Sequence, residues 1–368
     1  MSDCVIIGGG LIGMLTAKEL VDAGCQVTIV DKGGIGRESS WAGGGIISPL
    51  YPWRYVDAIN HLACWSQKVY PELCSQLFEE TGVDPQLTQS GLLMLDVNDL
   101  DQAETWARRF DHQVERVVAS GLRTLEPLMA EQKFQSGLYM PTIHQVRNPR
   151  ILASLRKWLE SKGVAIQENQ SVSTIWTANN TLRGIKTDQQ SIEAKRVVVA
   201  GGAWSSLLFE RIGFNLEVFP VQGQMLLFKG HPGMIKHIVM HDGFYVIPRQ
   251  DGHILAGSTV EYRGYDKMTT EEAYAKLREA AVTIVPELAK LPIVKHWAGL
   301  RPGSENGVPF IAAVPDIEGL YVNTGHFRNG VVMGPASARL LADIMLERAC
   351  IVDPLPYDFP ALQMKASG

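Results

Sequence analysis

The sequence predicts an α/β protein of two domains, one with a parallel sheet and one with a large, mostly antiparallel sheet. The length of 368 residues is about twice that of a common domain of roughly 150 residues. Residues 4–31 read as strand, helix and strand, which predicts a parallel βαβ unit. Between residues 223 and 256, strand-like runs follow one another without a helix, which is typical of an antiparallel sheet.

The composition limits the class of protein. Hydrophobic residues make up 46% of the chain and charged residues 20%, which excludes a disordered protein. The net charge is −5 and no run of basic residues occurs, so we expect no nucleic-acid partner. The five cysteines form no C-x-x-C pair and the nine histidines no H-E-x-x-H motif. We therefore expect a reducing compartment and no metal site.

No segment has the pattern of a membrane span or of a signal peptide. The longest uncharged stretches, Cys4–Ala17 and Ser39–Trp53, are glycine-rich and too short, since a transmembrane helix needs about 20 apolar residues. The first basic residue is Lys18, so the positively charged start of a signal peptide is missing. We therefore expect a cytoplasmic protein without an integral membrane segment.

The first structural unit is a βαβ unit. Cys4–Ile7 is a β-branched run of the kind that forms buried parallel strands. Leu11–Ala23 has apolar residues at helical spacing and is followed by Gly24, a suitable C-cap. Gln26–Val30 is a second β-branched strand.

The turn between the first strand and the helix has the spacing G-x-G-x-x-G, with Gly8, Gly10 and Gly13 at the fixed positions. Gly8 permits a tight turn, Gly10 lets a pyrophosphate approach the backbone, and Gly13 lets the helix pack close to the strand. Asp31 ends the second strand, where a carboxylate accepts hydrogen bonds from ribose hydroxyls and repels a 2′-phosphate. The pattern predicts a Rossmann-like, dinucleotide-binding domain and argues against NADP.

Further elements follow along the chain without an internal repeat or a low-complexity linker. Helices are predicted over residues 61–81, 100–119, 149–162, 271–285 and 335–348, the third with Asn148 as its N-cap. Strands are predicted over residues 91–95, 164–175, 182–187, 196–200, 223–228, 244–248, 253–256, 297–302 and 319–323.

Two later glycine loops favour FAD over NAD as the dinucleotide. Gly201-Gly202 follows the strand at 196–200, and Gly325–Gly330 follows the strand at 319–323. A long, buried FAD needs contacts along its whole length, and separated loops supply backbone N–H groups for them. Taken singly, each loop is explained equally well as an ordinary turn from strand to helix.

Four segments together resemble a known family: residues 5–13, residues 197–204, W-A-G-L-R-P-G at 297–303 and G-H-F-R-N-G at 325–330. The chain is similar to FAD-dependent amino-acid oxidases of the D-amino-acid oxidase family, and among these to glycine oxidases of thiamine biosynthesis. The resemblance covers nearly the whole chain. It implies a discontinuous FAD-binding domain of residues 1–85, 145–218 and 300–368, and a substrate-binding domain of residues 86–144 and 219–299.

The resemblance also implies a substrate site. Arg301 holds the substrate carboxylate, which a guanidinium matches with two parallel, charge-assisted hydrogen bonds. Tyr245 supplies a hydroxyl to the same carboxylate, and Arg328 lies near the substrate. From the residues alone, a structural arginine, a core tyrosine and a surface charge stay open as alternatives for these three. No residue is assigned as a general acid or base.

The cofactor contacts that the resemblance implies run from the first loop to the last. Val172 is placed at the adenine end, and Asp31 and Lys32 at the ribose, where glycine oxidases often have Glu. No cysteine lies between Cys74 and Cys350, so we expect FAD to be bound non-covalently. The expected FAD contacts are Gly8, Gly10, Leu11, Ile12, Gly13, Asp31, Lys32, Ser39, Ser40, Gly44, Gly45, Ile46, Val172, His326, Phe327, Arg328, Asn329, Gly330, Val331 and Val332.

The implied reaction is the oxidative deamination of glycine or another small amino acid. Its products are the α-keto acid (glyoxylate from glycine), ammonia and hydrogen peroxide, with dioxygen as the electron acceptor. The Cα hydrogen is expected to leave as a hydride toward flavin N5, so the protein's task is positioning and electrostatics. Residues 48–53 and 242–244 depart from the glycine oxidase pattern, so sarcosine, D-alanine and larger amines stay open as substrates.

Two alternative functions stay open. The first is a sarcosine or D-amino-acid oxidase, or a dehydrogenase of the same superfamily that passes electrons to a quinone. The second is a non-catalytic, FAD-binding subunit of an amine dehydrogenase, which would leave Arg301, Tyr245 and Arg328 without a purpose. A role in thiamine biosynthesis and a homo-oligomeric state are expected as well.

Overall fold

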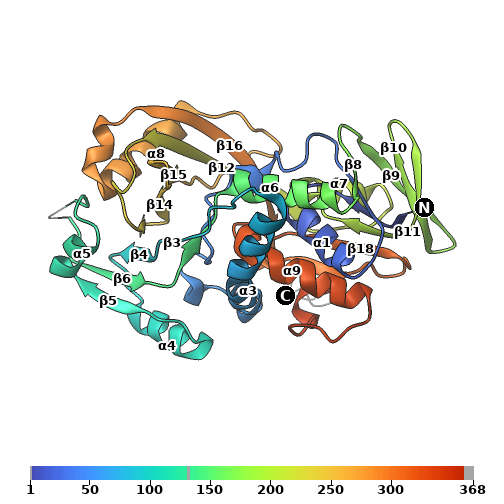
Figure 1. Cartoon of the computed structure of the whole chain (residues 1–368), viewed down its shortest axis with the longest axis horizontal. Coiled ribbons are helices and arrows are strands. Elements are labelled where there is room, and N and C mark those ends of the chain that lie inside the picture. Colours follow the sequence, from blue (N-terminus) through green and yellow to red (C-terminus); the bar gives the residue numbers. More distant parts are fainter. Residues whose placement is uncertain (1, 131–132, 360–368) are drawn as a thin grey trace.

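The computed structural model describes residues 2–130 and 133–359. The predicted domain ranges also include residues 1, 131–132 and 360–368, which lie outside the described residues. Within the described residues, two eight-stranded sheets lie side by side along the long axis of the molecule (Figure 1). One is largely parallel and the other largely antiparallel, which confirms the fold class that the sequence predicts.

The first sheet has the strand order β17-β18-β11-β1-β2-β8, and the hairpin of β9 and β10 joins it at β11. Its pairs from β18 to β8 are parallel, and β17 is an antiparallel edge strand. In the central β1, Cys4–Ile7 is at most 5% exposed, because neighbours on both sides cover a β-branched run. The strands are β1 (Ser2–Ile7), β2 (Val27–Val30), β8 (Ala165–Gln167), β9 (Val172–Ala178), β10 (Thr181–Thr187), β11 (Ser191–Val199), β17 (Phe310–Ala313) and β18 (Leu320–Thr324).

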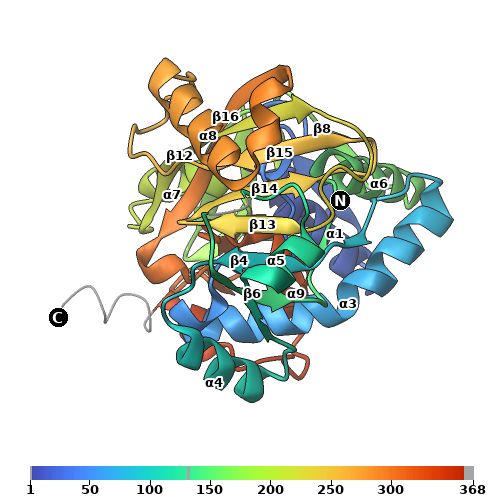
Figure 2. The ribbon, with the colours of Figure 1, turned by 90° about the vertical axis from the view of Figure 1, so that its left-hand side faces the viewer.

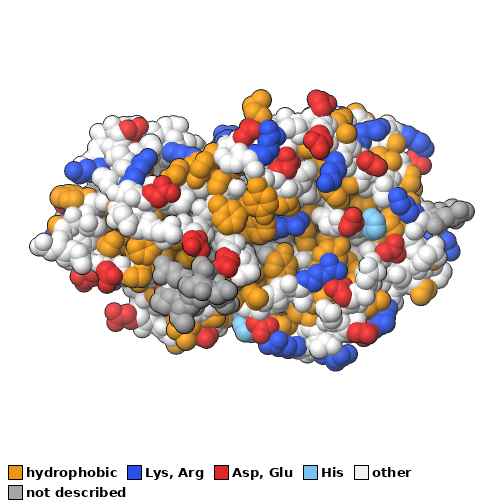
Figure 3. Space-filling model, turned by 180° about the vertical axis from the view of Figure 1, so that it is seen from behind, with side chains coloured by type: hydrophobic (Ala, Val, Ile, Leu, Met, Phe, Trp, Pro, Cys, Tyr) orange, Lys and Arg blue, Asp and Glu red, His pale blue; other side chains and the backbone are white. Residues whose placement is uncertain are grey.

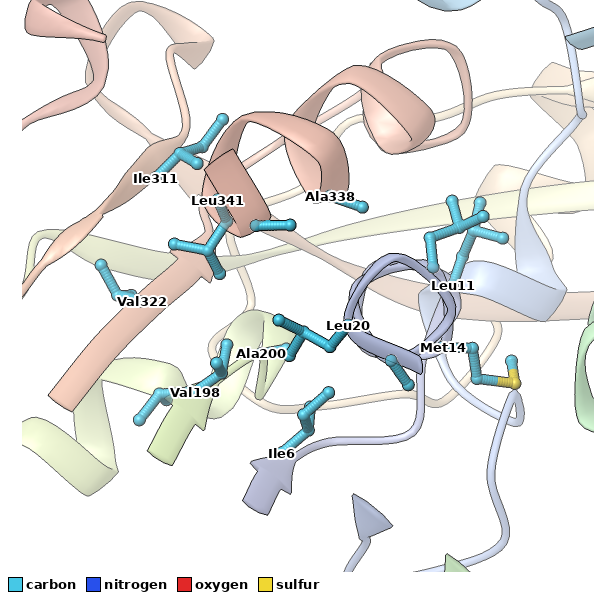
Figure 4. Close-up of a cluster of buried hydrophobic side chains, with 14 of the residues drawn as sticks. Ile6, Leu11, Met14, Leu20, Val198, Ala200, Ile311, Val322, Ala338 and Leu341 are labelled. Atoms are coloured by element: carbon cyan, nitrogen blue, oxygen red, sulfur yellow. The ribbon is translucent and has the colours of Figure 1, made fainter. Parts of the chain in front are cut away.

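Helices pack on this sheet and on one another. The helices α1 (Leu11–Asp22) and α9 (Gly330–Met345) lie beside each other, and α3 (Asp57–Thr81) packs against α9 and α6 (Asn148–Ser161). Side chains of α1 and α9 meet those of β1, β11 and β18 in one hydrophobic cluster (Figure 4). Its members Ile6, Leu20, Val198, Val322 and Leu341 are completely buried, so this core fixes both helices on the sheet.

The second sheet has the strand order β16-β12-β15-β14-β13-β4-β6-β5, with β13 and β4 as its only parallel pair among the described residues. Figure 2 views the molecule from this side, with α8 at the top and α4 at the bottom. Its elements are β4 (Leu92–Leu95), β5 (Glu115–Val118), β6 (Ser136–Met140), β12 (Val218–Lys229), β13 (Ile238–His241), β14 (Phe244–Pro248), β15 (His253–Gly257), β16 (Ile293–Ser304), α4 (Leu100–Phe110), α5 (Ala119–Leu125) and α8 (Glu271–Ile284). The domain boundary expected at residue 300 falls within β16.

Short elements connect the larger ones. A two-stranded sheet pairs β3 (Thr88–Gln89) with β7 (His144–Gln145), and two short helices are α2 (Ser39–Ala42) and α7 (Ser205–Glu210). Short 3₁₀ helices occupy Pro52–Arg54, Gly202–Trp204, Pro286–Lys290, Glu305–Gly307 and Leu355–Tyr357.

Two elements that the sequence predicts as single are divided in the structure. The helix predicted over residues 100–119 ends at Phe110, because Asp111 takes a left-handed conformation (φ 57°) as its C-cap, and β5 follows. The strand predicted over residues 164–175 is split into β8 and β9 around Asn169, which also has a positive φ of 56°. β8 pairs with β2, whereas β9 forms a hairpin with β10, so one apolar run serves two different partners.

The last helix begins five residues earlier than the sequence predicts, at Gly330 instead of Pro335. A proline inside a helix lacks an N–H group and leaves the carbonyl four residues before it without its helical donor. Here that carbonyl belongs to Val331, and it accepts a 2.6 Å hydrogen bond from the Tyr70 hydroxyl. Ser66 Oγ accepts from the Ala336 N–H at 2.9 Å. Both side chains come from α3, so tertiary contacts let α9 continue through the proline.

The surface carries charges of both signs. Figure 3 shows basic and acidic side chains interspersed on that face, around a central hydrophobic area. Across residues 2–130 and 133–359, no helix is long and apolar enough to cross a membrane. In the same part of the chain, no three His, Cys, Asp or Glu side chains are grouped so that they could hold a metal ion.

Candidate active site

One cavity takes its lining from both sheets. Loops that follow β1, β2, β11 and β18 reach it, because the carboxyl ends of parallel strands meet at one edge of a sheet. β12, β14 and β16 of the second sheet supply another part of its wall. The predicted contact residues that line it are Gly8, Gly10, Leu11, Ile12, Asp31, Lys32, Ser39, Ser40, Gly44, Gly45, Ile46, Val172, Tyr245, Arg301, His326, Phe327, Arg328, Asn329, Gly330 and Val331.

Two predicted contact residues are not part of the lining. Gly13 lies on the strand side of α1, where a Cβ atom would overlap the carbonyl oxygen of Gly8. Gly13 therefore serves the close packing of helix on strand. Val332 is 1% exposed inside α9, where it belongs to the hydrophobic core.

The first glycine loop leaves the start of α1 open to the cavity. Gly8 has a φ of 107°, and a Cβ atom there would overlap the carbonyl oxygen of Ala200. At Gly10, only Ser40 Oγ would come within 4 Å of a Cβ atom, at 3.1 Å. Ser40 Oγ also accepts from the Leu11 N–H at 2.9 Å. The free N–H groups of a helix N-terminus favour phosphate, so this loop suits a pyrophosphate.

Asp31 and Lys32 lie at the end of β2. The two carboxylate oxygens of Asp31 accept backbone N–H groups of Gly9 at 2.7 Å and Gly33 at 2.8 Å. Burial raises the pKa of Asp31 above its usual value, and these two hydrogen bonds counteract that shift. Each oxygen keeps a lone pair for a ribose hydroxyl. The Lys32 ammonium lies 3.2 Å from the ring centroid of Trp204, and burial lowers its pKa.

The segment from α2 to Ile46 is held from behind. Asn148 is not the N-cap that the sequence predicts, because Arg147 takes that position. Instead, Asn148 Nδ2 donates to the Ser40 carbonyl at 2.7 Å. The Gly45 carbonyl accepts from the Val146 N–H at 2.8 Å. Contacts from α6 and the residues before it thus fix a wall of the cavity.

The last glycine loop ends at the N-terminus of α9. His326 and Asn329 line the cavity and are 1% and 3% exposed. In the described parts of the chain, neither His326 Nε2 nor Asn329 Nδ2 has a hydrogen-bond partner. Burial lowers the pKa of His326 to about 3, so the ring is neutral near pH 7. A buried polar atom without a hydrogen-bond partner costs free energy of folding, so these two nitrogens suit hydrogen bonds to a polar ligand.

These features fit FAD. The helices α1 and α9 both begin at the cavity, and each offers a positive dipole end. The partnerless nitrogens of His326 and Asn329 suit a polar ring, and Asp31 suits a ribose. No cysteine is found among the lining residues, which agrees with non-covalent binding.

Glycines on three neighbouring strands make room at the sheet side of the cavity. Gly223 of β12 pairs with Gly299 of β16, and Gly257 of β15 pairs with Tyr245 of β14. A Cβ atom at Gly257 would lie 3.0 Å from the Tyr245 hydroxyl and 2.9 Å from Met225 Cε. A Cβ atom at Gly223 would overlap the guanidinium of Arg301. The functional side chains therefore occupy space that these glycines leave free.

Arg301 is a partly buried cation whose hydrogen-bond partners among the described residues are all neutral acceptors. Its Nη1 donates to the Thr259 carbonyl at 3.0 Å and to the Gln222 carbonyl at 3.4 Å, and Nη2 donates to Ser258 Oγ at 2.7 Å. Burial lowers its pKa to about 10. Because no carboxylate of the described chain neutralises it, the guanidinium suits a ligand carboxylate.

Tyr245 and Arg328 complete the polar end of the cavity. The Arg328 guanidinium has no hydrogen bond or ion pair with any residue that the structure describes, and its charge contributes to the lowered pKa of Arg301. Tyr245 is 7% exposed, and its hydroxyl lies beside Gly44 and Gly257. Two positive charges and one hydroxyl can bind and orient a small carboxylate.

Sequence reasoning missed part of this arrangement. Gly223, Ser258 and Met225 line the cavity, and Arg249 lies behind its wall. Gly223 stands two residues before Met225 in a run predicted to be a strand, where a glycine indicates a close approach. That signal was available, whereas nothing local distinguishes Ser258 or Arg249.

The comparisons with known proteins show the family of this chain. The family described as DAO, FAD dependent oxidoreductase, matches residues 3–344. A glycine oxidase of Pseudomonas aeruginosa is 46% identical over 354 residues, which are 96% of this chain and 97% of the relative. A bifunctional protein ThiO/ThiG of a Synechocystis species is 28% identical, over 97% of this chain and 53% of the relative.

A solved structure has the same architecture. The crystal structure of glycine oxidase from Geobacillus kaustophilus superimposes with a TM-score of 0.91 at 28% sequence identity, covering 97% of this chain and 98% of that one. The family match, the identity over nearly the whole length and the cavity lead to one conclusion. The chain belongs to the DAO family of FAD-dependent oxidoreductases.

Proposed function

We propose that this protein oxidises glycine, or another small amino acid, to the imine and thereby to the α-keto acid, ammonia and hydrogen peroxide. The observation that carries the proposal is Arg301, a partly buried guanidinium in the cavity without a carboxylate partner among the described residues. The names of the glycine oxidases to which the chain is similar support glycine as the first substrate to test.

The chain's own residues act by binding and orientation in this proposal. Arg301 and Tyr245 hold the substrate carboxylate, and Arg328 adds a second positive charge. FAD, when bound through the lining residues named above, would supply the acceptor for the hydride of the substrate Cα–H bond, whose loss turns the Cα–N bond into the double bond of the imine. Water then hydrolyses the imine, and dioxygen takes up the electrons to give hydrogen peroxide. Fixing the reacting atoms in a near-attack geometry is the main contribution of the protein.

No side chain need act as a base if the amine binds in its neutral form. The carboxylates that line the cavity are Asp31 and Glu38. Asp31 accepts backbone N–H groups, and Glu38 forms an ion pair with Lys267 at 3.1 Å. His326 is neutral near pH 7 because burial lowers its pKa. These contacts give neither lining carboxylate the role of a general base.

The substrate panel is the direct test. The purified holoenzyme is supplied with glycine, sarcosine, D-alanine and larger D-amino acids, and hydrogen peroxide is measured. Leu50 and Met225 line the cavity and limit its volume, so we expect glycine or sarcosine to give the highest kcat/KM. Peroxide from none of them, with flavin that a substrate bleaches, that stays bleached in air and that a quinone reoxidises, would favour the dehydrogenase. Failure of every amine to bleach the flavin anaerobically would favour the non-catalytic subunit.

The proposal also includes the pathway, the oligomeric state, the cellular location and the domain division of the protein. Thiamine biosynthesis is supported by the similarity to a ThiO/ThiG protein. A homo-oligomer, the cytoplasmic location and the division into domains stay predictions. Light scattering on the purified protein tests the first, and fractionation of cells tests the second. Limited proteolysis followed by mass spectrometry tests the domain division.

A further inference from the structure

Arg249 is a buried arginine near the site, and unlike Arg301 it is not part of the cavity lining. It follows the last residue of β14 and is 9% exposed. Its Nη1 donates to Gln145 Oε1 at 2.6 Å and to the Val146 carbonyl at 3.2 Å, and Nη2 donates to the Gly44 carbonyl at 2.8 Å. One guanidinium therefore joins two segments, residues 145–146 and Gly44, to the end of β14.

No carboxylate of the described residues forms an ion pair with this cation. Asp251, whose negative charge acts on Arg249, is itself paired with Arg147 at 2.7 Å. Burial lowers the pKa of Arg249 to about 10. A buried charge is costly unless hydrogen bonds compensate it. Here the compensation comes from neutral oxygens alone, so the guanidinium and the three oxygens fix one another's positions.

Gly44 is the point where this network reaches the site. A Cβ atom at Gly44 would lie 2.9 Å from Ile247 Cδ1 and 3.4 Å from the Tyr245 hydroxyl. Residues 245, 247 and 249 are two positions apart, so their side chains point to the same side of β14. The first two lie close to Gly44 Cα, and the third donates to the Gly44 carbonyl. Gly44 and Tyr245 line the cavity, whereas Arg249 does not.

Gln145 ties the same network to the second sheet. Its Nε2 donates to Ser90 Oγ at 2.6 Å and to the Pro248 carbonyl at 2.8 Å, while its Oε1 accepts from Arg249. Gln145 is 3% exposed, so its amide has its hydrogen-bond partners within the protein. The network thus links β7, the end of β14 and the Gly44 segment.

We infer that Arg249 is a positioning residue, which holds the Gly44 carbonyl and so sets residues 44–46 of the cavity wall against Tyr245. One guanidinium thereby couples residues 44–46, which are expected to contact FAD, to the Tyr245 hydroxyl, which is expected to contact the substrate. The substrate half of this inference rests on the proposed function. The cofactor half rests only on FAD as the group that the family binds.

The test compares Arg249→Lys and Arg249→Met with the matched pair Arg147→Lys and Arg147→Met. Arg147 is a neighbouring arginine whose side chain bonds to Gln86 and Asp251 and not to Gly44. For each holoenzyme, free FAD is measured in ultrafiltrates over a dilution series, at a temperature well below Tm. The visible absorption spectrum and the kcat and KM for glycine are measured at saturating FAD.

We expect Arg249→Lys to weaken FAD binding about tenfold, since an ammonium cannot reach all three oxygens in one plane. The visible flavin spectrum should shift, and KM should rise more than kcat falls, because Tyr245 is displaced. Arg249→Met should show larger effects in the same direction. Both Arg147 variants should keep the wild-type FAD affinity and spectrum.

A purely structural role predicts a different outcome. Arg249→Lys would then lower Tm but keep the FAD affinity, the spectrum and the KM of the wild type, and this result would overturn the inference. The outcome with Arg249→Lys decides the question even if Arg249→Met does not fold. If neither the wild type nor any variant oxidises any amino acid of the substrate panel, the proposed function fails, while FAD affinity and spectrum still test the cofactor half.

Discussion

The guanidinium of Arg301 fills the space that Gly223 leaves on the neighbouring strand. The two residues lie on β16 and β12, which pair antiparallel, and any Cβ atom at position 223 would overlap the guanidinium. The hydrogen bonds to Thr259 and Ser258 then hold the side chain in that place. The position of the proposed carboxylate anchor thus depends on the absence of a side chain at position 223.

Gly223→Ala should therefore displace Arg301 without affecting the cofactor. We expect KM for glycine to rise about tenfold, since a displaced charge-assisted hydrogen bond costs about 1.5–3 kcal/mol. FAD content should stay at one per chain. A double-mutant cycle with Arg301→Lys isolates the cause. If Gly223→Ala acts through Arg301, the two effects are not additive; full additivity would show that the glycine has another role.

Gly10→Val should abolish the retention of FAD. A valine side chain would enter the cavity at the start of α1, where the proposed pyrophosphate needs the backbone N–H groups. Gly33→Val is the matched control, because Gly33 does not line the cavity and has only Asp31 Oδ1 nearby, at 3.9 Å. Flavin absorbance per chain after gel filtration is the measurement. A yellow Gly10→Val protein with normal flavin content would refute the assignment of this loop.

Acid precipitation should release all of the flavin into the supernatant. None of the cavity's lining residues is a cysteine, and Cys4, the cysteine of β1, is buried in the hydrophobic core. Absorbance at the flavin maximum in both fractions measures the outcome. Yellow colour that stays with the precipitate would mean a covalent link through another residue type.

His326 should make the stability of the protein pH-dependent. Burial lowers its pKa from about 6.5 to about 3 in the folded protein, so between these values only the unfolded chain binds the proton. The free energy of unfolding then falls as the pH drops below about 6.5, by up to about 1.4 kcal/mol per pH unit.

The substitution His326→Gln should remove that contribution. Urea unfolding of the holoenzyme at pH 6.5, 5.5 and 4.5 should give a shallower decline for the variant than for the wild type. His61→Gln serves as the control, because His61 is exposed. Equal slopes for His326→Gln and the wild type would show that His326 is protonated in the folded state.

How much of this could be predicted depended on the range of the interactions. The first glycine loop and β1 were predictable, because Gly8, Gly10 and Gly13 form a short motif between a β-branched strand and a helix. The start of α9 was not, because Tyr70 and Ser66 of a distant helix satisfy the backbone around Pro335. Local reasoning about proline therefore gave a late start for that helix.

The residues of the site likewise differ in whether the sequence could indicate them. The family resemblance supplied Arg301 and Tyr245, and both line the cavity. It did not supply Arg249, whose three acceptors come from positions 44, 145 and 146. Such a network follows from the register of strands and loops, and a sequence taken alone does not contain that register.

The most direct test of the proposed function is the anaerobic reduction of the flavin by glycine in Arg301→Lys and in the wild type. Lysine keeps the charge but loses the planar fork, so it attracts the carboxylate without fixing its orientation. Stopped-flow absorbance should show weaker binding and a slower reduction, roughly ten- to a hundredfold in rate or affinity, with normal FAD content. Discrimination between glycine and methylamine should fall as well. Reduction at the wild-type rate and affinity, or loss of FAD, would contradict Arg301 as the anchor of the substrate carboxylate.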